Sequence, residues 1–130
     1  ARQMKVDSRV HFLGYRNDIP EIMCASDCLV FPSIHEGLPV SVIEAMAAGL
    51  PVIASSIRGI YPDLIRNGEN GLLLSANTPE EMARCVRLYM NNQGIAEKIA
   101  LSAREDVSEF NIDNLLRYMS EIYESFGVTN

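Results

Sequence analysis

Short apolar runs alternate with helical patterns along most of the chain, and this alternation constrains the fold more than any other feature. We expect strands at residues 10–13 (VHFL), 28–31 (CLVF), 51–54 (PVIA) and 71–74 (GLLL). Strands separated by helices are typical of a parallel sheet with right-handed crossovers. The sequence therefore predicts an α/β fold in which helices flank a four-stranded parallel sheet. The unbroken apolar run CLVF predicts a strand buried on both faces.

Capping residues give the expected helix boundaries. Asp18 with Glu21, and Thr78 with Glu81, have the spacing of a capping box, in which two residues satisfy backbone amides at a helix start. Gly49 is typical of the position that follows a helix end. We therefore expect helices at about residues 19–25, 39–48, 61–65, from 79 onward, 95–107 and 113–126.

The composition bounds the class of protein and its partners. A chain of 130 residues with 48% apolar content is long enough for one domain with a core. The net charge of −6 argues against nucleic acid or an anionic membrane as the main partner. It does not exclude phosphate, which backbone amides and one or two arginines can hold. The chain has no signal peptide or long apolar span, and its start, ARQMKVDSRV, looks like a cut through a longer protein.

The three cysteines, Cys24, Cys28 and Cys85, are odd in number and lack the spacing of metal ligands. We interpret Cys24 and Cys28 as small buried apolar residues. Unpaired thiols are typical of a reducing setting, so we expect a cytoplasmic protein.

The stretch from Glu36 to Pro51, EGLPVSVIEAMAAGLP, carries two glutamates separated by seven residues. The second, Glu44, lies in an almost wholly apolar helix. Burying a carboxylate there is costly unless another group pairs with it. The neighbouring sequence supplies no such group, so the pattern indicates a partner from elsewhere.

The glutamate loop should lie where ligands bind to parallel sheets, outside the carboxyl ends of the strands. A helix that begins near Pro39 leaves the backbone amides of Gly37 to Val40 largely unpaired, at the positive end of the helix dipole. This arrangement suits a phosphate or sugar hydroxyls, and Gly37 allows a close approach. Helical side chains lean toward the N-terminus, so Glu44 should face the same edge as Glu36. A solvated loop position for Glu36 and an exposed helix position for Glu44 remain the alternatives.

Residues 31–59, FPSIHEGLPVSVIEAMAAGLPVIASSIRG, resemble the donor-site signature of the retaining glycosyltransferases of family GT4. That family has the two-domain GT-B architecture and a paired-glutamate motif with seven residues between. The segments RVHFLGYRNDIPEIMCASDCLVFPS and YPDLIRNGENGLLL extend the resemblance over about residues 9–126. It implies a Rossmann-like sheet within the C-terminal, donor-binding domain. Residues 1–130 would form a single partial domain, and the N-terminal acceptor domain would be absent.

The resemblance also implies roles for individual residues. Glu36 would be the catalytic-site glutamate, placed beside the transferred sugar to contact its hydroxyls rather than to act as a nucleophile. Glu44 would bind the ribose hydroxyls of the nucleotide, and Gly14 and Tyr15 would lie near the nucleobase. The Gly37–Val40 segment would approach the sugar and diphosphate. The implied donor-binding residues are Gly14, Tyr15, Gly37, Leu38, Pro39, Val40 and Glu44.

The implied activity is transfer of a sugar, with retention, from a UDP- or GDP-sugar to an acceptor hydroxyl in polysaccharide or glycolipid biosynthesis. No metal or other cofactor is expected, because basic side chains and amides stabilise the leaving diphosphate in this family. The acceptor saccharide or lipid-linked saccharide would bind through the missing domain, which could also associate with a membrane. Two alternatives are a GT-B-type epimerase or phosphorylase, and a non-catalytic nucleotide-sugar-binding module.

The chain departs from the family pattern in its basic residues. Family members carry an arginine and a lysine that hold the leaving diphosphate, and Arg2 and Lys5 do not match them. We therefore expect residues 1–130 alone to transfer no sugar, and to self-associate through apolar surface left open by the truncated sheet. Ser33, His35 and Arg58 lie at the same edge, where surface roles are the default.

Overall fold

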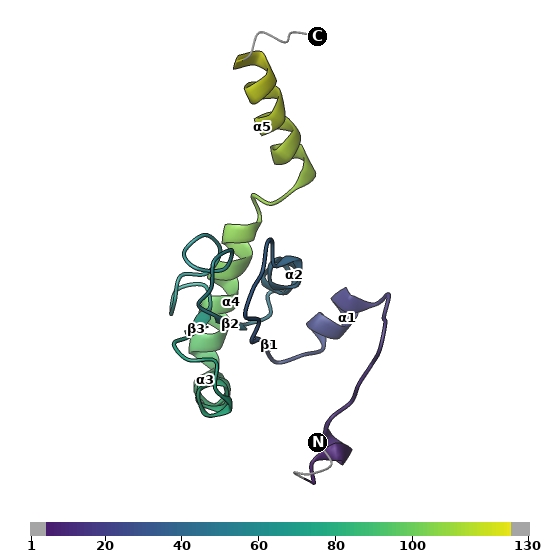
Figure 1. The fold of residues 1–130 in the computed structure, drawn as a ribbon, viewed down its shortest axis with the longest axis vertical. Coiled ribbons are helices and arrows are strands. Elements are labelled where there is room, and N and C mark those ends of the chain that lie inside the picture. The colour runs from purple at the N-terminus through teal and green to yellow at the C-terminus, as the bar shows by residue number, and fades with distance from the viewer. Residues whose placement is uncertain (1–4, 126–130) are drawn as a thin grey trace.

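The computed structural model describes residues 5–125, without the side chains of residues 112, 115, 118 and 123–125. Three strands form one sheet, with helices packed around it (Figure 1). The fold is thus the α/β arrangement expected. In chain order the elements are the 3-10 helix η2 (Asp7–Arg9), α1 (Ile19–Cys24), β1 (Leu29–Phe31), α2 (Val40–Ala47), β2 (Val52–Ser55), β3 (Leu72–Leu74), α3 (Pro79–Asn91), α4 (Gln93–Val107) and α5 (Ile112–Ser125).

The sheet is parallel, in the order β1-β2-β3. Leu29 lies opposite Val52, and Ile53 lies opposite Leu72. All four residues of β2 are buried, whereas the three residues of β1 are only half-buried. The expectation that the CLVF run is buried on both faces was therefore wrong, because β1 occupies an edge of the sheet described.

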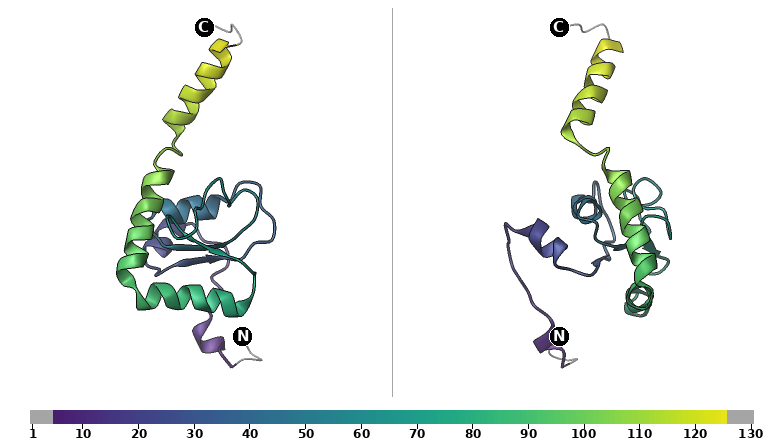
Figure 2. Two further views of the ribbon diagram at one scale, coloured as in Figure 1. Left: turned by 90° about the vertical axis from the view of Figure 1, so that its left-hand side faces the viewer. Right: turned by 180° about the vertical axis from the view of Figure 1, so that it is seen from behind.

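The strand expected at residues 10–13 is absent. These residues have no ladder partner within residues 5–125, and Phe12 is 91% exposed. The segment that contains them stands apart from the sheet before the chain enters α1 (Figures 1 and 2). An apolar run forms a strand when a neighbour pairs with its backbone groups. Among the described residues β1 pairs only with β2, and residues 10–13 do not pair with its other edge.

The two expected capping boxes have different outcomes. Thr78 Oγ1 accepts a hydrogen bond from the backbone amide of Glu81 at 3.3 Å, so α3 begins as predicted. Only this half of the capping box forms, because the Glu81 carboxylate binds Ser75 and Ala76 and the Thr78 amide donates to Ala76 O. The Asp18 carboxylate makes no capping bond to α1. It accepts hydrogen bonds from Arg16, which also lower its pKa. The prediction for Asp18 failed because an adjacent guanidinium competes with backbone amides for the carboxylate.

The helix that carries Glu44 begins one residue later than expected, with Pro39 just outside its first turn. It ends at Ala47 with Ala48 as the C-cap, and Gly49 follows with a φ of +72°, the left-handed conformation that glycine adopts without strain. Leu50 N then donates to Ala45 O at 2.9 Å. The short helix expected at residues 61–65 is a series of turns.

Two apolar clusters hold the helices to opposite faces of the sheet. In Figure 2, α2 covers one face, α3 covers the other, and α4 runs past the side of the sheet from one layer to the other. The first half of α4 accordingly packs with α3, through Ala96 and Ile99. Its second half packs with α2, through Ala103 and Val107. This helix therefore joins the two layers.

The cysteines differ in their burial. Cys85 is buried and Cys28 is half-buried, and burial raises the pKa of both thiols. Cys24 is exposed, so its assignment to the interior was wrong. Tyr89 packs in the same cluster as Cys85 and donates its hydroxyl to Val52 O at 3.0 Å, and burial raises its pKa.

The buried side-chain amide of Asn70 fixes the turns that precede β3. Asn70 is fully buried, and its Oδ1 accepts from the Arg66 amide at 2.7 Å. Its Nδ2 donates to Leu64 O at 3.1 Å and to Asp106 Oδ2 at 2.7 Å. The Arg66 side chain also donates to Asp106, so the turns before β3 are tied to α4.

The helix α5 extends away from the sheet and its flanking helices (Figure 1). Leu116, Met119 and Ile122 are exposed on it. The predicted helix end at residue 126 lies outside the described residues. Between residues 5 and 125, no helix is both long and apolar enough to cross a membrane.

The loop between β3 and α3 is held by one carboxylate. Glu81 accepts hydrogen bonds from Ser75 Oγ at 2.6 Å, Ala76 N at 2.5 Å and Arg84 Nη2 at 3.0 Å. These bonds, first of all that from Ser75, lower the pKa of Glu81 from 4.5 to about 2. The charged carboxylate therefore stabilises this loop.

We predict an acid-dependent contribution to stability from Glu81. Because its pKa is lower in the folded chain, the contribution is complete above pH 4.5 and is lost as the pH falls toward about 2. Glu81→Gln should lower the melting temperature at pH 7, and the difference from wild type should shrink in that acid range. Thermal unfolding followed by circular dichroism measures this. Glu80→Gln, at the exposed neighbouring position, is the control and should show no such pH-dependent difference.

Candidate functional site

The carboxyl ends of the three parallel strands meet at one edge of the sheet, and the candidate site lies there. Three loops follow these ends: residues 32–39 after β1, residues 56–60 after β2 and residues 75–78 after β3. The first of these loops carries Glu36, the first glutamate of the motif, and leads into α2, which carries Glu44.

Glu36 is half-buried in the loop after β1. The Ser33 hydroxyl lies 2.7 Å from Glu36 Oε1 and 3.2 Å from His35 O. A hydroxyl has one proton, and the shorter contact to the charged acceptor is the stronger hydrogen bond. Glu36 is therefore an oriented carboxylate rather than a freely solvated one.

The start of α2 presents fewer free amides than expected. Val40 N donates to Leu38 O at 2.9 Å, so the expectation of an unpaired Val40 amide was wrong. The amides of Gly37 and Leu38 have no hydrogen bond to another residue of the described chain. Both residues are exposed, whereas Pro39 is fully buried. The amides of this loop that lack a partner in the described chain are thus those of Gly37 and Leu38.

Two glycines meet behind this step. A Cβ atom added to Gly59, which has a φ of +85°, would lie 2.7 Å from Gly37 O and 3.5 Å from Glu36 O. The loop after β2 therefore backs the Glu36 loop at a distance that no side chain permits. A Cβ atom added to Gly37 would meet no atom within 4 Å, so the space in front of Gly37 is open.

Glu44 lies in α2 beyond this loop. It is exposed, while Val42, Ala45 and Met46 of the same helix are buried. The expected burial cost therefore does not arise. Its carboxylate forms no hydrogen bond or ion pair with the residues that the structure describes.

The predicted nucleobase contacts lie on a different segment. Gly14, with a φ of +66°, and Tyr15, which is 93% exposed, precede α1 in the stretch that stands off the sheet (Figure 1). Within residues 5–125, no hydrogen bond or ion pair joins them to the Glu36 loop. Their assignment as donor-binding residues stays a prediction.

Sequence reasoning missed three residues at this edge. Gly59 supports the Glu36 loop, and Ser55 and Asn77 form hydrogen bonds that reach Pro32. A signal existed: Ser55 ends β2, and Asn77 follows β3 by three residues, so both are polar residues at carboxyl ends of strands. Nothing in the sequence, however, indicates that these residues touch each other.

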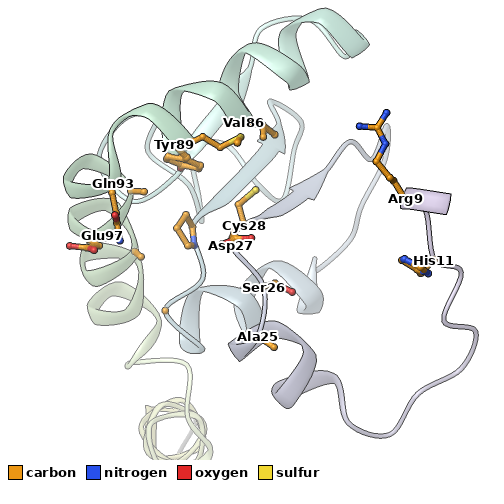
Figure 3. Close-up of a pocket in the computed structure, with 15 residues that line it drawn as sticks. Arg9, His11, Ala25, Ser26, Asp27, Cys28, Val86, Tyr89, Gln93 and Glu97 are labelled. Carbon is orange, nitrogen blue, oxygen red and sulfur yellow. The ribbon is translucent and has the colours of Figure 1, made fainter. Parts of the chain in front are cut away.

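A hollow lies near the edge of the sheet opposite to the Glu36 loop (Figure 3). Its lining includes Cys28 and Pro51, which directly precede β1 and β2, together with Arg9, Tyr89 and Glu97. It therefore opens at the amino ends of the strands and shares no residue with the Glu36–Glu44 motif. Within residues 5–125 no group of three or more His, Cys, Asp or Glu residues could hold a metal ion.

Comparison with known proteins gives consistent matches. Residues 1–92 match the family described as Glycosyl transferases group 1. The putative glycosyltransferase EpsD of Bacillus subtilis is 31% identical over 126 residues, which cover 97% of this chain and 33% of EpsD. The Escherichia coli UDP-Gal:alpha-D-GlcNAc-diphosphoundecaprenol alpha-1,3-galactosyltransferase is 45% identical over 74 residues, 57% of this chain and 19% of that enzyme.

A solved structure extends the similarity to the fold. The crystal structure of HepE from Anabaena, in complex with UDP and glucose, matches with a TM-score of 0.89 and 28% identity. The match covers 95% of this chain and 34% of HepE. The chain thus spans about a third of the length of EpsD and of HepE. Because the family match covers residues 1–92 of 130, this chain belongs to the group 1 glycosyltransferases.

Proposed function

We propose that this chain is the donor-binding part of a retaining GT-B glycosyltransferase of family GT4. The complete enzyme would move a sugar from a nucleotide-diphosphate donor to an acceptor hydroxyl. The observation that carries the proposal is the arrangement at the carboxyl edge of the sheet. There, the oriented carboxylate of Glu36 adjoins the amides of Gly37 and Leu38, which have no partner among the described residues, and α2, which carries the exposed Glu44, begins just after them.

In the proposed site, each group binds one part of the donor. Glu36 contacts hydroxyls of the transferred sugar, and Glu44 binds the ribose, because carboxylates accept hydrogen bonds from vicinal hydroxyls. The Gly37–Leu38 amides face the diphosphate. Gly14 and Tyr15 contact the nucleobase. Val40 contacts the donor through its exposed side chain. Pro39 is buried, so it contributes by shaping the loop and not by direct contact.

The proposed reaction requires stabilisation of charge on the leaving group. The bond between the anomeric carbon and the diphosphate oxygen breaks, and a bond to the acceptor oxygen forms as that hydroxyl loses its proton. Negative charge grows on the diphosphate. Amides that already point toward it at the start of α2 stabilise this charge without reorganising. Basic side chains from outside this chain would complete the stabilisation, and we propose no role for a metal.

The partners of the whole protein are also proposals. A UDP-sugar is favoured as donor, because HepE binds UDP and the Escherichia coli enzyme is named for UDP-Gal. The latter name also favours a lipid-linked saccharide as acceptor, bound by an N-terminal domain that this chain lacks. The free thiols described favour a cytoplasmic setting. Exposed apolar residues such as Phe12 and Leu116 favour self-association of residues 1–130 when isolated.

The nucleotide part of the proposal predicts a specific loss of affinity. In the complete enzyme, UDP and UDP-sugars should raise the melting temperature in a thermal-shift screen. Glu44→Ala should weaken UDP binding about tenfold or more, because hydrogen bonds to a charged group contribute about 1.5–3 kcal/mol each. Isothermal titration calorimetry measures the affinity. Glu105→Ala, on the exposed face of α4, is the matched control.

Unchanged UDP affinity in Glu44→Ala would contradict the ribose assignment. Binding of nucleotide sugars without turnover, in the presence of acceptor saccharides, would favour a non-catalytic binding module. Conversion of the donor sugar without transfer would favour an epimerase.

The sugar-diphosphate part predicts an effect of a single methyl group. Gly37→Ala adds a Cβ atom into open space, so folding should be unaffected. The same methyl group should obstruct the donor and weaken binding of a UDP-sugar about tenfold, since overpacking costs about 1–3 kcal/mol. Gly94→Ala is the matched control, because a Cβ atom there also meets no atom within 4 Å. Equal donor affinity for the two variants would show that the donor does not approach Gly37.

A further inference from the structure

Side-chain hydrogen bonds tie together the loops at the carboxyl edge of the sheet. Ser55 Oγ donates to Asn77 Oδ1 at 2.9 Å. Asn77 Nδ2 donates to Pro32 O at 2.9 Å. One asparagine after β3 is thereby bonded to the last residue of β2 and to the first residue after β1. We name Ser55, Asn77 and the Pro32 carbonyl the edge clasp.

The chemistry of the partners fixes the orientation of the Asn77 amide. The Pro32 carbonyl can only accept, so the amide nitrogen must face it. The amide oxygen then faces Ser55, whose hydroxyl supplies the proton. Ser55 is 3% exposed, and its other acceptor, Phe31 O, lies at the longer distance of 3.5 Å. Both ends of Asn77 are therefore matched to their partners.

The edge clasp leads directly to the Glu36 carboxylate. Ser33 follows Pro32, and its hydroxyl donates to Glu36 Oε1 at 2.7 Å. Asn77 Nδ2 also lies 3.5 Å from Ser33 O. The position of the Ser33 hydroxyl, and with it the orientation of Glu36, therefore depends on the backbone that Asn77 holds. The bond from Ser33 engages Oε1 and leaves Oε2 for a ligand.

Asn77 is itself held in place by its own loop. The Glu81 carboxylate binds Ser75 and Ala76 immediately before it. Thr78, immediately after it, caps α3 through the Glu81 amide. Although Asn77 is exposed, its neighbours in sequence on both sides are held by hydrogen bonds. Its side-chain amide therefore keeps a fixed orientation toward Pro32.

The contacts of Asn77 are polar and lie outside both apolar clusters of the core. Removing its side chain creates no cavity in the core, but it leaves the buried Ser55 hydroxyl with only its longer contact to Phe31 O, so we expect a moderate fall in melting temperature. The main consequence should fall on the Glu36 loop. The position of the Glu44 carboxylate should not change, because the fully buried side chains of Val42 and Met46 fix α2 by packing.

We propose that Asn77 and Ser33 are positioning residues for Glu36: the edge clasp sets the backbone after β1, and Ser33 transmits that position to the carboxylate. This inference rests on the proposed function and deepens it. It predicts that the sugar end of the donor site can be disturbed separately from the nucleotide end.

The test uses the complete enzyme and its Asn77→Ala and Ser33→Ala variants. We expect kcat for sugar transfer to fall about tenfold in each, while the Kd for UDP stays unchanged. Ser33→Thr keeps the hydroxyl and should restore most of the rate. Asn92→Ala is the matched control, since Asn92 Nδ2 also donates to a backbone carbonyl, Leu88 O at 3.0 Å, at the far end of α3. It should lower the melting temperature, though less than Asn77→Ala does because it leaves no buried hydroxyl unpaired, and it should leave kcat unchanged.

A double-mutant cycle separates positioning from a general structural effect. If Asn77 acts through Glu36, Asn77→Ala should cause little further loss of kcat in a Glu36→Gln background. Additive losses, an unchanged kcat in Asn77→Ala, or a parallel loss of UDP affinity would overturn this inference while the proposed function stands. A wild-type enzyme that neither binds nor turns over any nucleotide sugar would overturn the proposed function and this inference with it.

Discussion

The parallel pairing of β2 with strands on both sides is the interaction on which the rest of the structure depends. Its four residues are buried, and its register sets Leu29 opposite Val52 and Ile53 opposite Leu72. Parallel strands must be joined by connections that cross a face of the sheet. The two connections, through α2 and through the turns before β3, pack against one face, and α3, which follows β3, packs against the other. The carboxyl ends of the three strands therefore lie at the same edge. Three loops distant in sequence thereby become neighbours.

This convergence concentrates polar side chains at one edge of an apolar core. Ser55 is almost fully buried there, and a buried hydroxyl without a partner would be costly. Asn77 meets this requirement and also reaches the loop after β1. The hydrogen bonds of Asn77 therefore pair the buried Ser55 hydroxyl and also hold Pro32, the residue before Ser33, which bonds to Glu36. Folding and site geometry share one set of contacts at this edge.

The sequence predicted the elements whose signals are local. Three apolar runs form β1, β2 and β3, each within one residue of its expected bounds. A short apolar run between turn residues is typical of a buried strand, so these strands could be predicted from local sequence. Thr78 capped α3 as expected, since its partner lies three residues away. Residues 10–13 have the same local pattern but no paired neighbour, so pattern alone did not make them a strand.

Contacts between distant residues escaped prediction. Asn77 is 45 residues from Pro32 and 22 from Ser55, and no periodicity links such positions. The need for glycine at position 59, where a Cβ atom would lie 2.7 Å from Gly37 O, depends on how two loops meet. The paired glutamates were found because both lie in one short segment with a helix start between them. The residues that surround Glu36 were not predicted, because they come from the loops after β2 and β3, which are distant in sequence.

The two glutamates are supported by different physical interactions. Glu44 belongs to a helix that is fixed by apolar burial, which has no direction and tolerates small shifts. Glu36 belongs to a loop fixed by hydrogen bonds, whose strength depends steeply on distance and angle. A group that binds a ribose needs a stable position, whereas a group beside a reacting sugar needs a defined orientation. In the proposed donor site, the packed helix therefore suits the nucleotide, and the hydrogen-bonded loop suits the sugar.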